Sequence, residues 1–77
     1  MGDEKKVVLE LMPDQALVLF EWLARFNRQE NGQFEDQAEQ RVLFDLESML
    51  ERTLTAPLDP NYKRLLAMAR DRIRDGQ

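Results

Sequence analysis

The sequence predicts a small, mostly α-helical domain with one N-terminal β-strand at about residues 5–11 and helices at about 13–28, 35–54 and 60–75. Two observations predict this fold class. Apolar residues alternate with a period close to two before residue 12, and they recur at helical spacing in three later segments. Proline or an Asn-Gly pair stands near the expected helix ends. At 77 residues, the chain has room for one domain, covering 1–77.

The strand is predicted from the string KKVVLEL, in which Val7, Leu9 and Leu11 fall on one side of an extended chain. A lone strand leaves its amides and carbonyls unpaired, and no second strand of comparable quality follows. We therefore expect two copies to pair as an antiparallel ribbon in a homodimer. Two alternatives stay open: residues 5–11 lie as an arm on their own helices, or they pair with Thr55–Leu58.

The first helix is expected to begin at Pro13, after Met12, whose side chain makes a weak N-cap. Its apolar residues spread over roughly 260° of a helical wheel. A surface helix needs an apolar stripe only a little wider than about 100°. The helix is therefore either central in the fold or covered by a second subunit. We expect the dimer interface to include five apolar residues from the strand and this helix: Val7, Leu9, Leu11, Val18 and Trp22.

The second helix is amphipathic and follows the turn signal Asn31-Gly32. Its first turns carry Glu35, Asp36 and Glu39, which the helix dipole favours. Glu39 falls on the apolar side, so it is either a partly solvated or paired residue near the helix start or a functional carboxylate. The expected apolar side consists of Ala38, Val42, Leu43, Leu46, Met49, Leu50 and Leu54.

The third helix is expected after Thr55-Ala56-Pro57, with Asp59 as its N-cap and Pro60 at its first position. Gly76 supplies a stop signal. The expected apolar side consists of Tyr62, Leu65, Leu66, Ala69 and Ile73.

The amino-acid composition lacks two side chains that many catalytic mechanisms use. The chain has no cysteine and no histidine, so disulfides, thiolate chemistry and imidazole bases are absent. Its hydroxyl-bearing side chains have no evident base nearby in the sequence. The three glycines are too scattered for a phosphate-binding loop. We expect no enzyme, no cofactor and no metal site.

Charge points instead to a protein partner. Residues 1–60 carry 13 acidic and 6 basic groups, for a net charge of −7. An acidic stripe beside an exposed aromatic ring on the second helix suits a basic protein, as in immunity or antitoxin-like proteins that neutralise a basic partner. In the alternative interpretation, Phe44 packs under the third helix or in the dimer interface. The predicted partner-binding residues are Asp36, Gln40, Phe44, Glu47 and Glu51.

A nucleic-acid-associated regulator is the alternative function. Residues 61–77 carry five basic and two acidic groups, and Lys63, Arg70 and Arg74 could contact phosphates. The net charge of −4 over the whole chain makes nucleic acid an unlikely partner. No apolar run is long enough for a membrane span, and the opening MGDEKK lacks the apolar core of a signal peptide, so a cytoplasmic location is expected.

Three strings together carry a resemblance over nearly the whole chain: LELMPDQALVLFEWLARF, FEDQAEQRVLFDLESMLE and LDPNYKRLLAMAR. They are similar to a set of short uncharacterised bacterial proteins with a strand, an ALVLFEWLARF-like helix, an EDQAEQ helix and a P-x-Y-x-x-L-L-x-x-A-R helix. The resemblance implies a compact cytoplasmic bacterial protein and supplies no catalytic residues. Met12 departs from the Ser or Thr expected at that helix cap.

Overall fold

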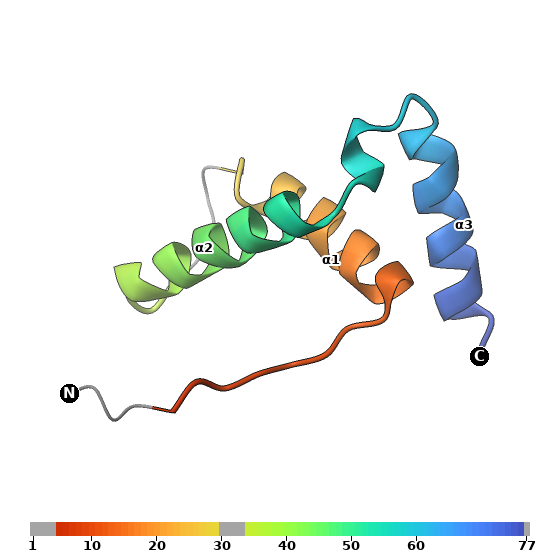
Figure 1. The fold of residues 1–77 in the computed structure, drawn as a ribbon. Helices are drawn as coiled ribbons and strands as arrows, with labels where there is room; N and C mark the ends of the chain where they lie inside the picture. The colour runs from red at the N-terminus through yellow and green to blue at the C-terminus, as the bar shows by residue number, and fades with distance from the viewer. Residues whose placement is uncertain (1–4, 30–33, 77) are drawn as a thin grey trace.

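The computed structural model describes residues 5–29 and 34–76, and its regular structure is helical (Figure 1). The order of elements is α1 (Pro13–Phe26), α2 (Gln37–Thr53), the short 3-10 helix η1 (Ala56–Leu58) and α3 (Tyr62–Arg74). The prediction of a mostly α-helical chain is thus confirmed. The helix α1 packs against both α2 and α3, so it is the central element of the fold.

The start of α1 is set by Pro13, which occupies the first helical turn. Met12 has an extended backbone, as expected before a proline, and its side chain makes no cap hydrogen bond. Gln15 compensates, because its Oε1 accepts a hydrogen bond from the Met12 N–H at 2.8 Å. The helix ends at Phe26, two residues before the predicted end, and Arg28 and Gln29 continue in tighter turns.

The start of α2 is set by Asp36, which is its N-cap. An Asp36 carboxylate oxygen accepts from the Ala38 N–H at 2.7 Å. Glu39 is exposed, and its Oε1 accepts from the Glu35 N–H at 3.0 Å. Glu39 therefore stabilises the start of α2, which agrees with the interpretation of Glu39 as a partly solvated or paired residue near the helix start. The helix is shorter than 35–54 because Asp36 and Leu54 both have extended backbone and cap its ends.

The start of α3 differs from the prediction. Asp59 and Pro60 form a turn in which the Tyr62 N–H bonds to the Asp59 carbonyl at 3.0 Å. The Asp59 carboxylate accepts from the Asn61 N–H at 2.7 Å. Asn61 is the cap residue, so the helix begins at Tyr62 rather than at residue 60. Gly76 follows the helix with a φ of 92°, which confirms the predicted stop.

Two apolar clusters form the core, and α1 contributes to both. In the first, Phe20 and Leu23 of α1 pack with Leu50 of α2. In the second, Leu17 of α1 packs with Leu66 and Ala69 of α3. This two-sided packing explains the wide apolar circumference of α1 within a single copy. The apolar side of α2 is only partly used, since Val42 and Met49 are exposed.

Polar contacts join α1 to both of its neighbouring helices. Arg72, near the end of α3, makes a two-pronged contact with Asp14 at the start of α1, with N···O distances of 2.7 and 2.8 Å. Tyr62, at the start of α3, donates to Glu21 in the middle of α1 at 2.6 Å. The end of α3 therefore lies beside the start of α1. Asn27, the C-cap of α1, donates to the Leu43 carbonyl and the Glu47 carboxylate of α2 at 3.3 and 2.7 Å.

Residues 5–12, called the arm below, do not form the predicted strand. The structure assigns no strand anywhere within residues 5–29 and 34–76. The arm leaves α1 in an extended course (Figure 1), and Val7 is 90% exposed and Leu9 81% exposed. This exposure excludes an arm packed on its own helices, and the helical turn at Ala56–Leu58 excludes pairing there. A strand needs a neighbouring strand for its backbone hydrogen bonds, and the described residues of one copy offer none.

Candidate docking surfaces

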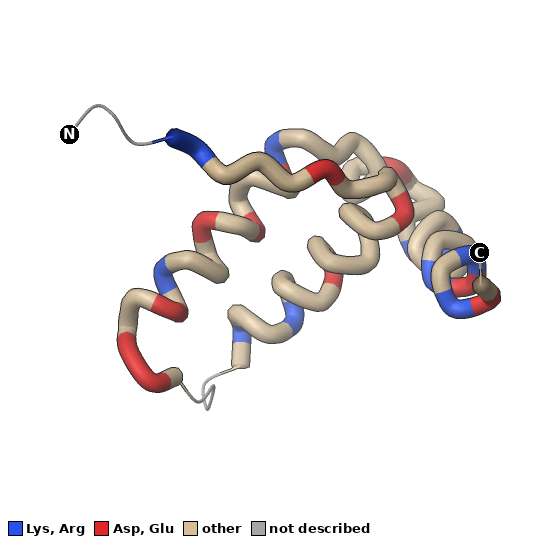
Figure 2. The backbone as a smooth tube through the Cα atoms, turned by 90° about the horizontal axis from the view of Figure 1, so that it is seen from below, with Lys and Arg blue, Asp and Glu red and all other residues tan. Residues whose placement is uncertain are grey.

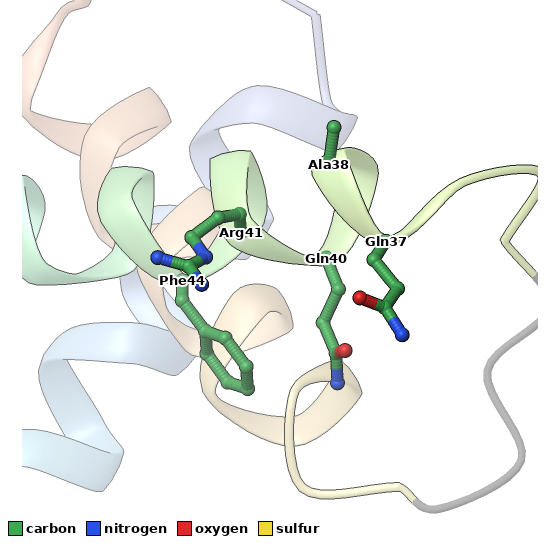
Figure 3. Close-up of a pocket in the computed structure, with 5 residues that line it drawn as sticks. All are labelled: Gln37, Ala38, Gln40, Arg41 and Phe44. Carbon is green, nitrogen blue, oxygen red and sulfur yellow. The ribbon is translucent and has the colours of Figure 1, made fainter.

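The outer face of α2 holds part of the predicted partner-binding set. Gln40 and Phe44 line an open recess of about 780 Å³ together with Gln37, Ala38 and Arg41 (Figure 3). Gln37, Gln40 and Phe44 extend to the same side of the helix, whereas Ala38 points away from them. Phe44 is exposed and belongs to neither core cluster. An exposed ring beside amide side chains can take an apolar group and a hydrogen-bonding group of a partner together.

The acidic members of that set have different surroundings. Glu51 is exposed on α2, and Asp36 is exposed at its N-cap, where one oxygen is already used. Glu47 is half-buried and holds Asn27 at 2.7 Å. Glu47 therefore ties α1 to α2, and the freely accessible residues of the set are Asp36, Gln40, Phe44 and Glu51. The sequence prediction grouped Glu47 with the exposed acidic stripe, because the periodicity of one helix cannot show a contact with Asn27 on another.

The charge on the described surface is mixed but mainly acidic along α2. Residues 37–53 contain four acidic groups and two arginines, and Figure 2 shows these positions interspersed along the helix. On α3, two basic residues are engaged by carboxylates, Arg72 by Asp14 and Arg74 by Asp71. The Arg72 hydrogen bond lowers the pKa of Asp14 below its ordinary value of 3.8, and the same contact raises the pKa of Arg72. Of the three residues predicted to contact phosphates, Arg74 is engaged in this way, and Lys63 and Arg70 are exposed.

A second surface lies where the end of α1 meets the start of α2. Trp22 stacks on Phe26 with ring centroids 4.8 Å apart, and Phe34 meets Phe26 edge-on at 5.9 Å. An open recess of about 520 Å³ adjoins these rings. We call this recess the aromatic groove. Its lining residues are Phe26, Phe34, Ala38, Glu39, Val42 and Leu43.

The aromatic groove is apolar except for Glu39 at its edge. Val42 in its wall is 61% exposed, although its sequence position predicts burial. Sequence reasoning missed this groove, because it depends on how α1 and α2 meet. The available signals were the i, i+4 spacings of Trp22 with Phe26 and of Ala38 with Val42, which place each pair on one helix face.

The predicted dimer-interface residues fall into two groups. Val7, Leu9 and Leu11 are exposed on the arm, and Trp22 is exposed beside the aromatic groove. Val18 instead packs against the core cluster shared with α3, so a single copy already uses part of its surface. Only the first four remain accessible to a second copy.

Across the part of the chain that the structure describes, no group of three or more acidic side chains is arranged to hold a metal ion. Among the same residues, no helix has the length and apolar character that crossing a bilayer requires.

Comparisons with protein-family models, with curated proteins and with solved structures found no match to this chain.

Proposed function

We propose that this protein is a non-enzymatic protein–protein interaction module that acts as a homodimer and binds a basic protein through the outer face of α2. Neutralisation of a basic partner, as immunity or antitoxin-like proteins do, is the form of this function that the charge favours.

The observation that carries the proposal is the amount of surface that one copy leaves uncovered. Among the described residues, twelve large apolar side chains are exposed, and five of them lie on the arm. Much of the uncovered apolar surface lies on the arm, where Val7, Val8 and Leu9 are almost fully exposed. Patches of this kind are typical of interaction sites.

Homodimerisation accounts for the arm. Two copies of residues 5–11 can pair as an antiparallel ribbon across a twofold axis, which satisfies the backbone groups that a single arm leaves open. Val7, Leu9 and Leu11 of both copies would then lie on one face of the ribbon, and Val8 and Glu10 on the other.

The outer face of α2 supports the second part of the proposal. Phe44 offers an apolar anchor, and Asp36 and Glu51 offer exposed negative charge. Protein-binding patches commonly have an aromatic anchor and a polar rim. The excess of acidic groups over residues 1–60 would speed the approach of a basic partner.

The test compares two substitutions with the same change of charge on the same helix. Tagged protein carrying Glu51→Lys or Asp45→Lys is used to capture proteins from the native host. Both side chains are exposed, but Asp45 lies about 120° around the helix from Glu51. We expect a basic protein that the wild type and Asp45→Lys retain and that Glu51→Lys loses. Equal capture by both variants, or no basic protein among the captured species, would contradict the proposal.

A further inference from the structure

We propose that the aromatic groove is the seat for the arm of a second copy, so that each copy of the homodimer supplies one arm and one groove. This inference rests on the proposed homodimer, and it seats the two arms in the two grooves in place of pairing them as a ribbon.

The spacing of side chains on the arm fits the groove. On an extended chain, Val7, Leu9 and Leu11 point to one side at intervals of about 6.7 Å. On a helix, residues four apart repeat at about 6 Å along the axis. Ala38 and Val42 form one such pair in the groove. A second pair joins Phe26 of the groove to Trp22 beside it. Alternate arm residues can therefore meet successive turns of both helices.

The charges of the two surfaces are also complementary. The arm begins with Lys5 and Lys6, directly before its apolar run. Glu39 lines the groove, and Glu35 precedes it near the start of α2. An arm laid with its lysines toward this end would place positive charge beside these two carboxylates, and its valine and leucine side chains over the rings.

A second copy is the occupant that the observations favour. Within one copy the arm runs clear of both core clusters, and Val8 and Leu9 are 77% and 81% exposed. Its start at Met12 lies at the opposite end of α1 from Phe26, about 20 Å away along the helix. If two copies exchange arms, each arm covers the groove of the other copy. The same contact therefore forms twice, as in any twofold interface.

The test uses Trp22, the only tryptophan of the chain, as the reporter. Its emission is followed against protein concentration, with the mass measured by sedimentation on the same samples. Leu9→Asp is compared with Val8→Asp. Both residues are exposed in a single copy, so neither substitution disturbs its fold, but they lie on opposite sides of an extended arm. We expect a blue shift of emission as the wild-type dimer forms. Leu9→Asp should weaken dimerisation by about tenfold or more, and Val8→Asp should stay within about threefold of the wild type.

A groove variant provides an independent measurement. Val42 is exposed in a single copy, so Val42→Asp preserves the fold while placing a charge in the groove. We expect Val42→Asp alone to weaken dimerisation as Leu9→Asp does. A mixture of the two variants regains one intact arm and one intact groove, so it should form heterodimers at concentrations where neither variant dimerises alone.

The outcomes separate this inference from the homodimer itself. A wild-type dimer in which Leu9→Asp leaves the Trp22 emission unchanged would overturn the groove as the seat, while the homodimer would stand. The protein could instead be a monomer at every concentration, with a blue-shifted Trp22 emission that Leu9→Asp removes. That result would mean that the arm occupies the groove of its own copy. If the protein is a monomer and Leu9→Asp does not change its Trp22 emission, both the homodimer and the inference are wrong.

Discussion

Tyr62 donates its phenolic hydrogen to Oε1 of Glu21 across 2.6 Å, which joins the first turn of α3 to the middle of α1. Burial, and after it the hydrogen bond and negative charge of Glu21, raise the pKa of Tyr62 above its ordinary value of 10.0. The neutral phenol is therefore favoured by the folded state. Its contribution to stability is fully present below pH 10 and is lost as the pH rises through the higher folded-state pKa.

Because Tyr62 is the only tyrosine, its ionisation can be followed directly by ultraviolet absorbance. We expect the tyrosinate band to appear only well above pH 10 in the folded protein, and near pH 10 in urea. Glu21→Gln should shift the folded-state midpoint toward 10, since it removes the negative charge that opposes ionisation. A midpoint near 10 in the folded wild type would contradict the contact.

The contact between Asp14 and Arg72 predicts that the free energy of unfolding falls at acidic pH. Since the Arg72 hydrogen bond lowers the pKa of Asp14, the stability that it confers is present above pH 3.8 and is lost as the pH falls through the lower folded-state value. Urea unfolding of the wild type and of Asp14→Asn should therefore differ at neutral pH and converge below pH 3.8. A difference that stays constant down to pH 2 would mean that the contact does not form in solution.

Glu47 is predicted to be a structural residue of the α1–α2 junction. Glu47→Ala removes the carboxylate that holds Asn27 and leaves a half-buried amide with one bond fewer. We expect the free energy of unfolding to fall by about 1 kcal/mol. Glu51→Ala, on the exposed side of the same helix, should change it by less than ~0.5 kcal/mol. Equal effects in chemical denaturation would place Glu47 on the outer face, as the helical wheel alone allowed.

The largest loss of stability is expected at Leu23, whose side chain is fully buried between α1 and α2. Leu23→Ala should cost about 2–5 kcal/mol, which is a large part of the stability of so small a domain. Leu58→Ala serves as the matched control, because Leu58 lies on η1 and is 87% exposed. Circular dichroism during thermal unfolding measures both. A Leu23→Ala variant as stable as Leu58→Ala would contradict the described core.

The helices were predictable because local patterns determine them. Pro13 marks the first residue of α1, and the apolar periodicity located both ends of all three helices within two residues. The start of α3 was misjudged because Asp59 and Pro60 also make a good turn, and the Asp59 carboxylate bonds Asn61 within that turn.

The strand and the docking surfaces were less predictable, for reasons of tertiary structure. The alternation at Val7, Leu9 and Leu11 describes an extended chain, but only a neighbouring strand turns it into a β-strand. The wide apolar face of α1 had two explanations, and the packing of Leu17 against α3 accounts for it within one copy. The aromatic groove arises from the angle between two helices, which no single-helix pattern contains.

We propose that two copies cover the apolar surface that one copy leaves exposed. Sedimentation equilibrium of the full chain over a wide range of concentration measures whether they associate. We expect a mass that rises from 9.1 kDa toward twice that value, with Leu9→Asp shifting the transition to higher concentration. A mass of 9.1 kDa at every concentration, for both the wild type and the variant, would contradict it.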